Sequence, residues 1–198
     1  MKSLRIFYKM IPNSCDVFIP LINLPSYKTS KSESSFNYLF NRKVDQGVSI
    51  AMGSAMEQSI TQITEKLSKL ENIKEKNKKG VKEKDILFRD PVTNTVWYFE
   101  SKTNLNLDTE KAPATSKKIK EIKLENDYKG GLLALRWLSR DDIPKAIRNK
   151  FKDLDYDEIY GMNDYLNVVG VEQKFIDYDD YKCFVNAILD KIYPKNSL

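Results

Sequence analysis

The sequence of 198 residues contains no histidine, and this absence removes several classes of catalytic chemistry. Hydrolases with a Ser-His-Asp triad, metal sites with imidazole ligands and nucleases with a histidine base all need that side chain. Any hydrolytic chemistry of this chain must therefore use carboxylates, lysine, tyrosine or a metal ion that prefers oxygen ligands.

The chain is also poor in cysteine and in long apolar runs. Its two cysteines, Cys15 and Cys183, lie too far apart in the sequence for a metal-binding motif. We expect two buried, reduced thiols and a cytoplasmic location. No apolar run approaches the roughly 18 residues that a membrane span needs, and charges interrupt the N-terminus too often for a signal peptide. The sequence therefore predicts a protein with no membrane partner.

Apolar and aromatic residues are present in sufficient number for a core: 41% of the chain is hydrophobic, with nine Phe and eleven Tyr. The length predicts a single domain over 1–198. We divide it into an N-terminal arm (1–45), a core that holds the candidate site (48–140) and a C-terminal flank (141–198). The net charge of +5 favours a polyanionic partner such as DNA, although a solvated lysine-rich surface would have the same charge.

Apolar residues recur at steps of three or four from Val48 onward, which predicts an amphipathic helix of about five turns. The stripe consists of Met52, Met56, Ile60, Ile63, Leu67 and Leu70. Glu57 lies beside this stripe. Segment 66–84 is rich in lysine, and Gly80 can end the helix in a left-handed conformation. We interpret segment 66–84 as a solvated helix end or as a surface that follows phosphates.

The second half of the chain alternates between helical and strand-like patterns, which predicts an α/β fold with a mixed sheet flanked by helices. The expected helices cover 114–126, 141–151 and 178–192, and the expected strands cover 132–138 and 165–170. Gly130 and Gly131 are expected to break the chain before the first of these strands.

Segment 85–102 contains two apolar runs around a turn, which is the pattern of a β-hairpin. Pro91 fixes one backbone angle of the turn, and Asn94 tolerates a left-handed conformation. A loop over 91–94 would fix the register of both strands.

In this register Asp85 lies opposite Glu100, and Lys102 shares their face because side chains alternate along a strand. Two close carboxylates repel each other, and a divalent cation relieves that repulsion. Oxygen ligands favour Mg²⁺, and a nearby ammonium would suit attack of water on a phosphodiester. A register shifted by one residue would separate the two acids. A solvated ion pair of Lys102 at a strand end is the simpler alternative.

The spacing of these charges resembles the active-site motif of the PD-(D/E)XK nucleases. Asp85 and Glu100 match its acids, with 14 residues between them, and Ser101 and Lys102 complete the motif. Lys84 replaces the proline of the family's name, a position that varies in the family. The segment after Lys102, through about residue 125, resembles the corresponding segment in a group of type II restriction endonucleases.

The resemblance implies a restriction endonuclease-like fold with the acids on central strands. It also implies that Asp85 and Glu100 bind Mg²⁺ and that Lys102 orients or helps to deprotonate the attacking water. Glu57 matches an additional acid that members often supply from the preceding helix, where it would act through a second ion or a bound water. Cleavage of DNA would leave a 5′-phosphate and a 3′-hydroxyl.

Polar residues follow the candidate site and are suited to DNA contacts, because Asn pairs with adenine and Lys binds guanine or phosphate. These candidates are Asn104, Asn106, Thr109, Lys111, Thr115, Ser116, Lys117, Lys118 and Lys120. A solvated helix face would have the same composition, and Asp108 is expected to be a helix cap. Recognition of a palindromic site would require a homodimer.

The function that these observations favour is a type II restriction endonuclease that hydrolyses double-stranded DNA with Mg²⁺. The first alternative is a repair or junction-resolving nuclease of the same fold, against which the Asn- and Thr-rich segment favours base recognition. The second alternative is a non-catalytic DNA-binding protein whose acids are structural. The presence of Asp85, Glu100 and Lys102 together argues against this last interpretation.

Overall fold

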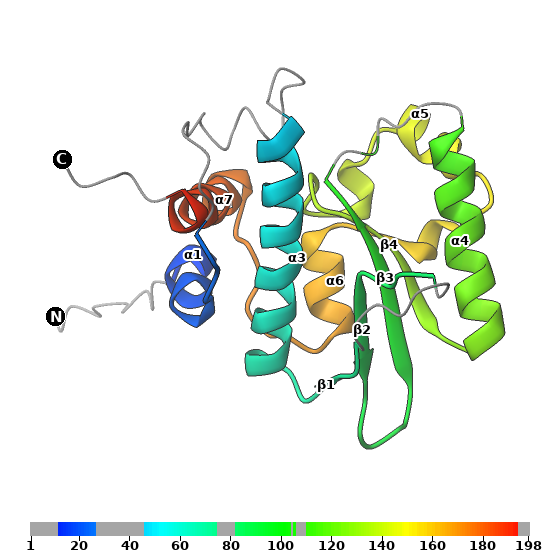
Figure 1. The fold of residues 1–198 in the computed structure, drawn as a ribbon, viewed down its shortest axis with the longest axis horizontal. Coiled ribbons are helices and arrows are strands. Elements are labelled where there is room, and N and C mark those ends of the chain that lie inside the picture. The colour runs from blue at the N-terminus through cyan, green and yellow to red at the C-terminus, as the bar shows by residue number, and fades with distance from the viewer. Residues whose placement is uncertain (1–11, 27–45, 75–81, 104, 106–109, 194–198) are drawn as a thin grey trace, which may run out of the picture.

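The computed structural model of the chain describes residues 12–26, 46–74, 82–103, 105 and 110–193. Within them, one five-stranded sheet has helices on both faces (Figure 1). The strands are β1 (Glu71–Asn72), β2 (Ile86–Arg89), β3 (Val96–Lys102), β4 (Lys129–Ala134) and β5 (Ile159–Tyr160). The α-helices are α1 (Ser14–Phe18), α3 (Gln46–Leu67), α4 (Lys111–Asn126), α5 (Lys145–Arg148), α6 (Met162–Val168) and α7 (Tyr178–Ile192). Short 3₁₀ helices are η1 (Ile19–Leu21), η2 (Arg140–Asp142), η3 (Asn149–Phe151) and η4 (Tyr156–Glu158).

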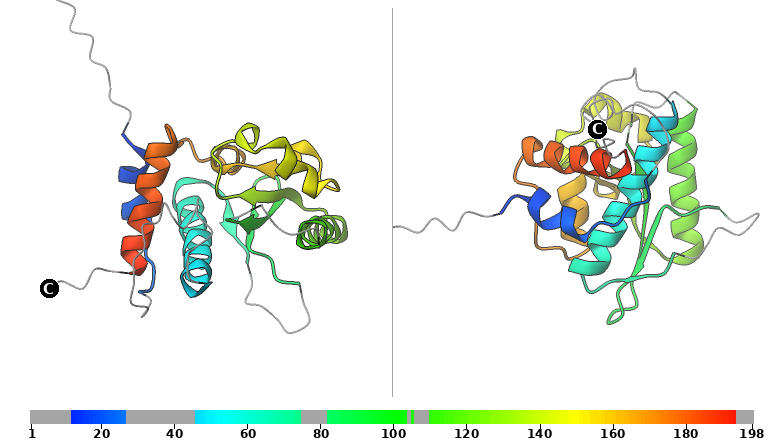
Figure 2. Two further views of the ribbon diagram at one scale, coloured as in Figure 1. Left: turned by 90° about the horizontal axis from the view of Figure 1, so that it is seen from above. Right: turned by 60° about the vertical axis from the view of Figure 1, so that its left-hand side comes forward.

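The sheet is mixed, as the sequence predicts. Its strand order is β1-β2-β3-β4-β5, in which β1, β2 and β3 pair antiparallel and β3, β4 and β5 pair parallel. The helix α4 connects β3 to β4 and covers one face, while α3 and α6 cover the other, with α1 and α7 outside α3 (Figures 1 and 2). The coarse prediction of an α/β fold with flanking helices is therefore confirmed.

The sheet separates two hydrophobic cores. Phe99 and Leu133 belong to the core that includes α3 and α7, whereas Tyr98, Leu132 and Ala134 belong to the core beneath α4. The central strands β3 and β4 are thus covered on both faces, which explains the uninterrupted apolar run at the start of segment 132–138.

The long helix ends earlier than the sequence pattern indicates. The helix α3 ends at Leu67, and Met52, Met56 and Ile60 of its stripe are buried. The Ser68 hydroxyl accepts the backbone N–H of Leu70 at 3.1 Å, which turns the chain toward β1. The predicted helix end near Gly80 is therefore wrong, and Gly80 itself lies outside the described residues.

The glycine pair at 130–131 lies inside β4 and does not break the chain. A Cβ on Gly130 would meet the Tyr98 carbonyl oxygen at 2.2 Å, and one on Gly131 would meet the Glu158 carbonyl oxygen at 2.1 Å. Glycine is needed here because the neighbouring backbone approaches so closely. The strand consequently starts at Lys129, three residues before the predicted start, and ends at Ala134.

The helix and strand predictions for the C-terminal half are partly confirmed. The terminal helix α7 has the predicted bounds, and α4 ends at Asn126 as predicted but begins at Lys111. Segment 141–151 is helical in three short pieces. The strand predicted over 165–170 is wrong, because this apolar run lies mostly in α6.

The residues Tyr165, Leu166 and Val169 are all buried, at the one- and four-residue spacings of a helix face. The strand of this region is β5, just before α6.

No helix in the described part of the chain is long and apolar enough to span a membrane. Both cysteines are free thiols, and the Sγ of Cys183 lies 2.6 Å from the Sγ of Cys15. Cys15 is buried as expected, whereas Cys183 is exposed, so the prediction of two buried thiols is wrong for Cys183.

The close approach of β4 to β3 predicts unequal effects of two glycine substitutions. Gly130 and Gly170 both have a positive φ, 96° and 75°, but a Cβ at Gly170 has no atom within 4 Å. We expect Gly170→Ala to lower the free energy of unfolding by about 1–2 kcal/mol through backbone strain alone. Gly130→Ala should cost about 3 kcal/mol or more, because β4 must also move away from Tyr98. Urea unfolding measures both, and equal losses would contradict the steric explanation.

Candidate active site

The hairpin of β2 and β3 has the predicted loop and register. Asp90 N–H donates to the Thr95 carbonyl at 2.8 Å, Asn94 N–H donates to the Asp90 carbonyl at 2.9 Å, and Asn94 has a φ of 58°. The strand pairs run from Arg89↔Val96 to Ile86↔Phe99. One further step in this register places Asp85 opposite Glu100, because side chains on paired strands share a face.

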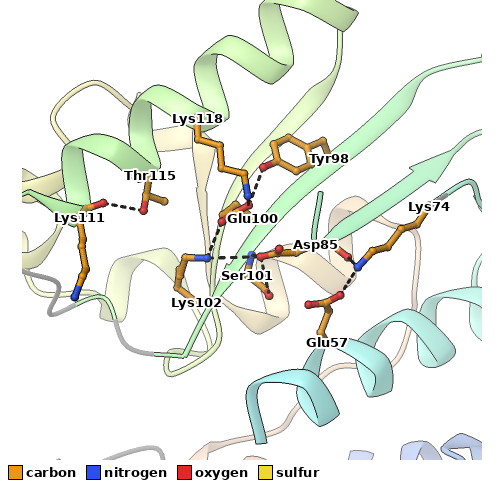
Figure 3. A network of polar contacts seen from close by, with 10 residues as sticks. All are labelled: Glu57, Lys74, Asp85, Tyr98, Glu100, Ser101, Lys102, Lys111, Thr115 and Lys118. Atoms are coloured by element: carbon orange, nitrogen blue, oxygen red, sulfur yellow. Dashed lines mark hydrogen bonds and ion pairs between the residues drawn. The ribbon is translucent and has the colours of Figure 1, made fainter. Parts of the chain in front are cut away.

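The three predicted charges converge at the end of this hairpin (Figure 3). Lys102 Nζ lies 2.7 Å from Glu100 Oε1 and 3.7 Å from Asp85 Oδ2. The side chains of Glu100, Asp85 and Lys102 are only 5%, 15% and 30% exposed. This burial does not fit a solvated ion pair at a strand end, for which water would cover all three groups.

Glu100 is the most buried of these groups, and both of its oxygens have partners. Besides Lys102, it accepts hydrogen bonds at Oε2 from the Tyr98 hydroxyl at 2.8 Å and from Lys118 Nζ at 2.6 Å. Burial alone would raise the pKa of Glu100, but the combined effect of Lys102 and Lys118 outweighs it and holds the pKa below its ordinary value. Glu100 is therefore a carboxylate at neutral pH.

Asp85 has the opposite electrostatic environment. Its Oδ2 accepts the backbone N–H of Ser101 at 2.9 Å, on the strand that carries Glu100. Burial, and then repulsion by Glu100, raise the pKa of Asp85 above its ordinary value despite the attraction of Lys102. Two carboxylates of which one resists ionisation are an arrangement that a divalent cation would stabilise.

Glu57 reaches the site from α3 through a lysine that the sequence analysis did not identify. Lys74 Nζ lies 2.5 Å from Glu57 Oε1 and donates to the main-chain carbonyl of Asp85 at 2.8 Å (Figure 3). Burial raises the pKa of Glu57 although Lys74 lowers it. Lys74 was concealed in the lysine-rich segment 66–84, where nothing local distinguishes it from its neighbours.

The donor atoms fit Mg²⁺ better than a softer metal. Mg²⁺ is commonly bound by one or two carboxylates together with water. Asp85 and Glu100 supply two carboxylates, and the Lys102 ammonium already lies between them as a cation. No group of three or more acidic or cysteine side chains that could hold a metal ion occurs among the described residues. Mg²⁺ held by two carboxylates ordinarily keeps several water ligands.

The candidate DNA contacts on α4 fall on different sides of the helix. Lys111, Thr115 and Lys118 project from the same side, on which Lys118 reaches Glu100 of β3 and the Thr115 hydroxyl donates to the Lys111 carbonyl (Figure 3). Ser116 is fully buried and its hydroxyl donates to the Ala112 carbonyl at 3.1 Å, which leaves it no surface for a base contact.

The remaining candidates divide into two groups. Lys117 and Lys120 are exposed on α4, where Lys117 lies 3.8 Å from Glu121 and Lys120 lies 4.0 Å from Glu158. Asn104, Asn106, Thr109 and the expected cap Asp108 lie outside the described residues. The N-terminal capping position of α4 is Glu110, whose side chain makes no capping hydrogen bond.

Comparisons of the chain with protein-family models, with curated proteins and with solved structures each found no match. The function must therefore be argued from the geometry of the site.

The two central carboxylates should respond oppositely to neutralisation. The pKa of Glu100 is lowered in the folded protein, so ionised Glu100 stabilises the fold once the pH exceeds its ordinary pKa. The pKa of Asp85 is raised, so ionised Asp85 destabilises the fold over the same rise in pH. We expect Glu100→Gln to lower the free energy of unfolding by about 3 kcal/mol, because two ammonium groups lose their partner. Asp85→Asn should leave it unchanged or higher, since the amide oxygen still accepts the Ser101 N–H. Urea unfolding at pH 8 in EDTA tests this, and equal losses would contradict it.

Proposed function

We propose that the protein is a Mg²⁺-dependent endonuclease of the PD-(D/E)XK type that hydrolyses double-stranded DNA. The observation that carries the proposal is the convergence of Asp85, Glu100 and Lys102 on one face of a hairpin with the required register. The position of these residues on β3 and before β2 in a mixed, helix-flanked sheet supports the same assignment.

Asp85 and Glu100 would hold Mg²⁺, which when bound supplies Lewis acidity and an activated water. Lys102 would orient the water and offset charge that develops on the phosphate. Burial alone would lower the pKa of Lys102, but Glu100 and Asp85 raise it above its ordinary value. Lys102 is therefore an ammonium in this state, which favours the electrostatic role over that of a general base.

Glu57 would have an auxiliary role. Its carboxylate is linked to the main-chain carbonyl of Asp85 through the single ammonium of Lys74. This contact orients the start of β2, and with it the Asp85 side chain. A direct role for Glu57 in holding a second cation would require Lys74 to move away.

The net charge and the polar side of α4 support DNA as the proposed substrate. Lys111 and Thr115 extend the polar surface from Glu100 along α4, where a phosphate backbone could run (Figure 3). We propose that the protein is a type II restriction endonuclease, acts in the cytoplasm as a homodimer, and leaves 5′-phosphate ends. A repair or junction-resolving nuclease would use the same site, and a non-catalytic DNA-binding protein would use the same surface.

Cleavage of unmethylated phage DNA provides the direct test. We expect discrete fragments with Mg²⁺ and none with EDTA. Glu100→Gln should reduce the rate at least 100-fold because it weakens the cation site, and Lys102→Met should do so because it removes a positive charge near the phosphate. The ion pair of Lys182 and Asp179 on α7, joined at 2.8 Å, offers matched controls outside the site. Lys182→Met and Asp179→Asn should cleave at the wild-type rate.

The form of the products separates the candidate functions. Discrete fragments support restriction, whereas a smear would indicate a nuclease without sequence specificity. Intact linear DNA with cleavage of branched DNA would indicate a junction-resolving enzyme. Binding of DNA without any Mg²⁺-dependent cleavage would refute the nuclease proposal and leave the acids with a structural role.

A further inference from the structure

The three candidate acids of the site are matched one for one by ammonium groups. Glu57 pairs with Lys74 and Glu100 pairs with Lys118, while Lys102 lies between Glu100 and Asp85. The three carboxylates and three ammonium groups have no net formal charge. A divalent cation that binds here would therefore add positive charge to a site that is already neutral.

The acceptor positions of Glu100 are nearly all in use. A carboxylate offers about four acceptor positions, and Glu100 uses them for Lys102, Lys118 and the Tyr98 hydroxyl. A cation close to Oε2 would meet the Lys118 ammonium at the distance of a hydrogen bond. Because like charges so close repel strongly in a buried site, one ammonium must leave when the cation binds.

Lys118 is the ammonium best suited to leave. Lys102 lies between two carboxylates of the hairpin, whereas Lys118 makes its ion pair with Glu100 from a different element, α4. The side chains of Lys118 and Lys102 are similarly exposed, at 27% and 30%, so the difference lies in their partners: one carboxylate for Lys118 and two for Lys102. The flexible four-carbon chain of lysine allows the ammonium to move while the helix stays in place.

The side of α4 that carries Lys118 indicates where its ammonium would go. Residues 111, 115 and 118 lie within about 60° of one another around a helix with 3.6 residues per turn. Figure 3 shows Lys111, Thr115 and Lys118 projecting from that side together. An ammonium released from Glu100 would join the surface on which we place the DNA backbone.

We infer that Lys118 is a further residue of the active site, which occupies Glu100 in the absence of a cation and moves to a substrate phosphate when a divalent cation binds. This inference rests on the proposed function for the identity of the phosphate. This exchange makes cation binding and DNA binding cooperative. The cation displaces Lys118 from Glu100 and so frees it for a phosphate, and a phosphate that binds Lys118 frees Glu100 for the cation. The reciprocal effect requires no change in the backbone.

Calorimetric titration of Mg²⁺ into the DNA-free protein tests the first half of the inference. We expect Lys118→Met to bind Mg²⁺ about tenfold more tightly than the wild type, because the competing ammonium is gone. Lys111→Met removes the same charge from the same side of α4 without an ion pair to Glu100, and it should change the affinity much less. Equal or weaker binding by Lys118→Met would overturn the inference, and so would an equal gain in both variants.

Binding of a DNA duplex without metal tests the second half, and it does not depend on cleavage. Glu100→Gln should bind DNA about tenfold more tightly than the wild type, because Lys118 is released toward the phosphates. The double variant Glu100→Gln, Lys118→Met should lose this gain in DNA affinity. The double variant Glu100→Gln, Lys111→Met should keep the gain, reduced only by the loss of affinity that Lys111→Met causes in the wild-type protein. A gain that survives the removal of Lys118 would overturn the inference.

The two proposals can fail separately. Tighter Mg²⁺ binding by Lys118→Met together with intact DNA would support the role of Lys118 at Glu100 and refute the nuclease. Mg²⁺-dependent cleavage with no effect of Lys118 on Mg²⁺ affinity would support the nuclease and refute this role. A wild-type protein and a Lys118→Met protein that both fail to bind Mg²⁺ would refute both.

Discussion

The burial of the Glu100 carboxylate on β3 is the constraint on which the rest of the site depends. An ionised group so deep in a sheet is costly unless charged partners surround it, and here the partners come from two elements: Lys102 from the same strand and Lys118 from α4. The helix must therefore lie close over β3 with one turn facing the carboxylate. Its apolar residues Ile119 and Ile122, buried in the core beneath it, hold it there.

The hairpin register is the second constraint, and it places Asp85. A displacement of one residue between β2 and β3 would send its carboxylate to the opposite face, away from Glu100. The register is fixed from both ends. The turn at 90–95 closes one end with two backbone hydrogen bonds, and at the other end Asp85 itself accepts the Ser101 N–H. The side chain that the register positions thus also helps to fix the register.

The local parts of this architecture could be predicted from the sequence, and the long-range parts could not. Turn chemistry and strand alternation were sufficient for the hairpin, its register and the convergence of Asp85, Glu100 and Lys102, because all of these lie within 18 residues of one another. The strand over the glycines at 130–131 was missed because its cause is the backbone of distant residues. The ion pairs of Lys74 with Glu57 and of Lys118 with Glu100 were missed for the same reason, although Lys118 was predicted as a DNA contact: the sequence does not show which carboxylate a lysine contacts in space.

The pairing of acids and lysines also determines what the site contributes at a distance. Three carboxylates and three ammonium groups, each within 3.7 Å of an opposite charge, form a set without net charge, whose field decays faster than that of a net charge. A polyanion approaching from beyond the Debye length of about 8 Å in physiological salt would hardly sense it. Any attraction at long range must therefore arise from the excess of five positive charges elsewhere on the chain. Under the proposed function, the first capture of a nucleic acid would then depend mainly on lysines outside this set, whereas reaction at its backbone would depend on the partly buried groups of the set.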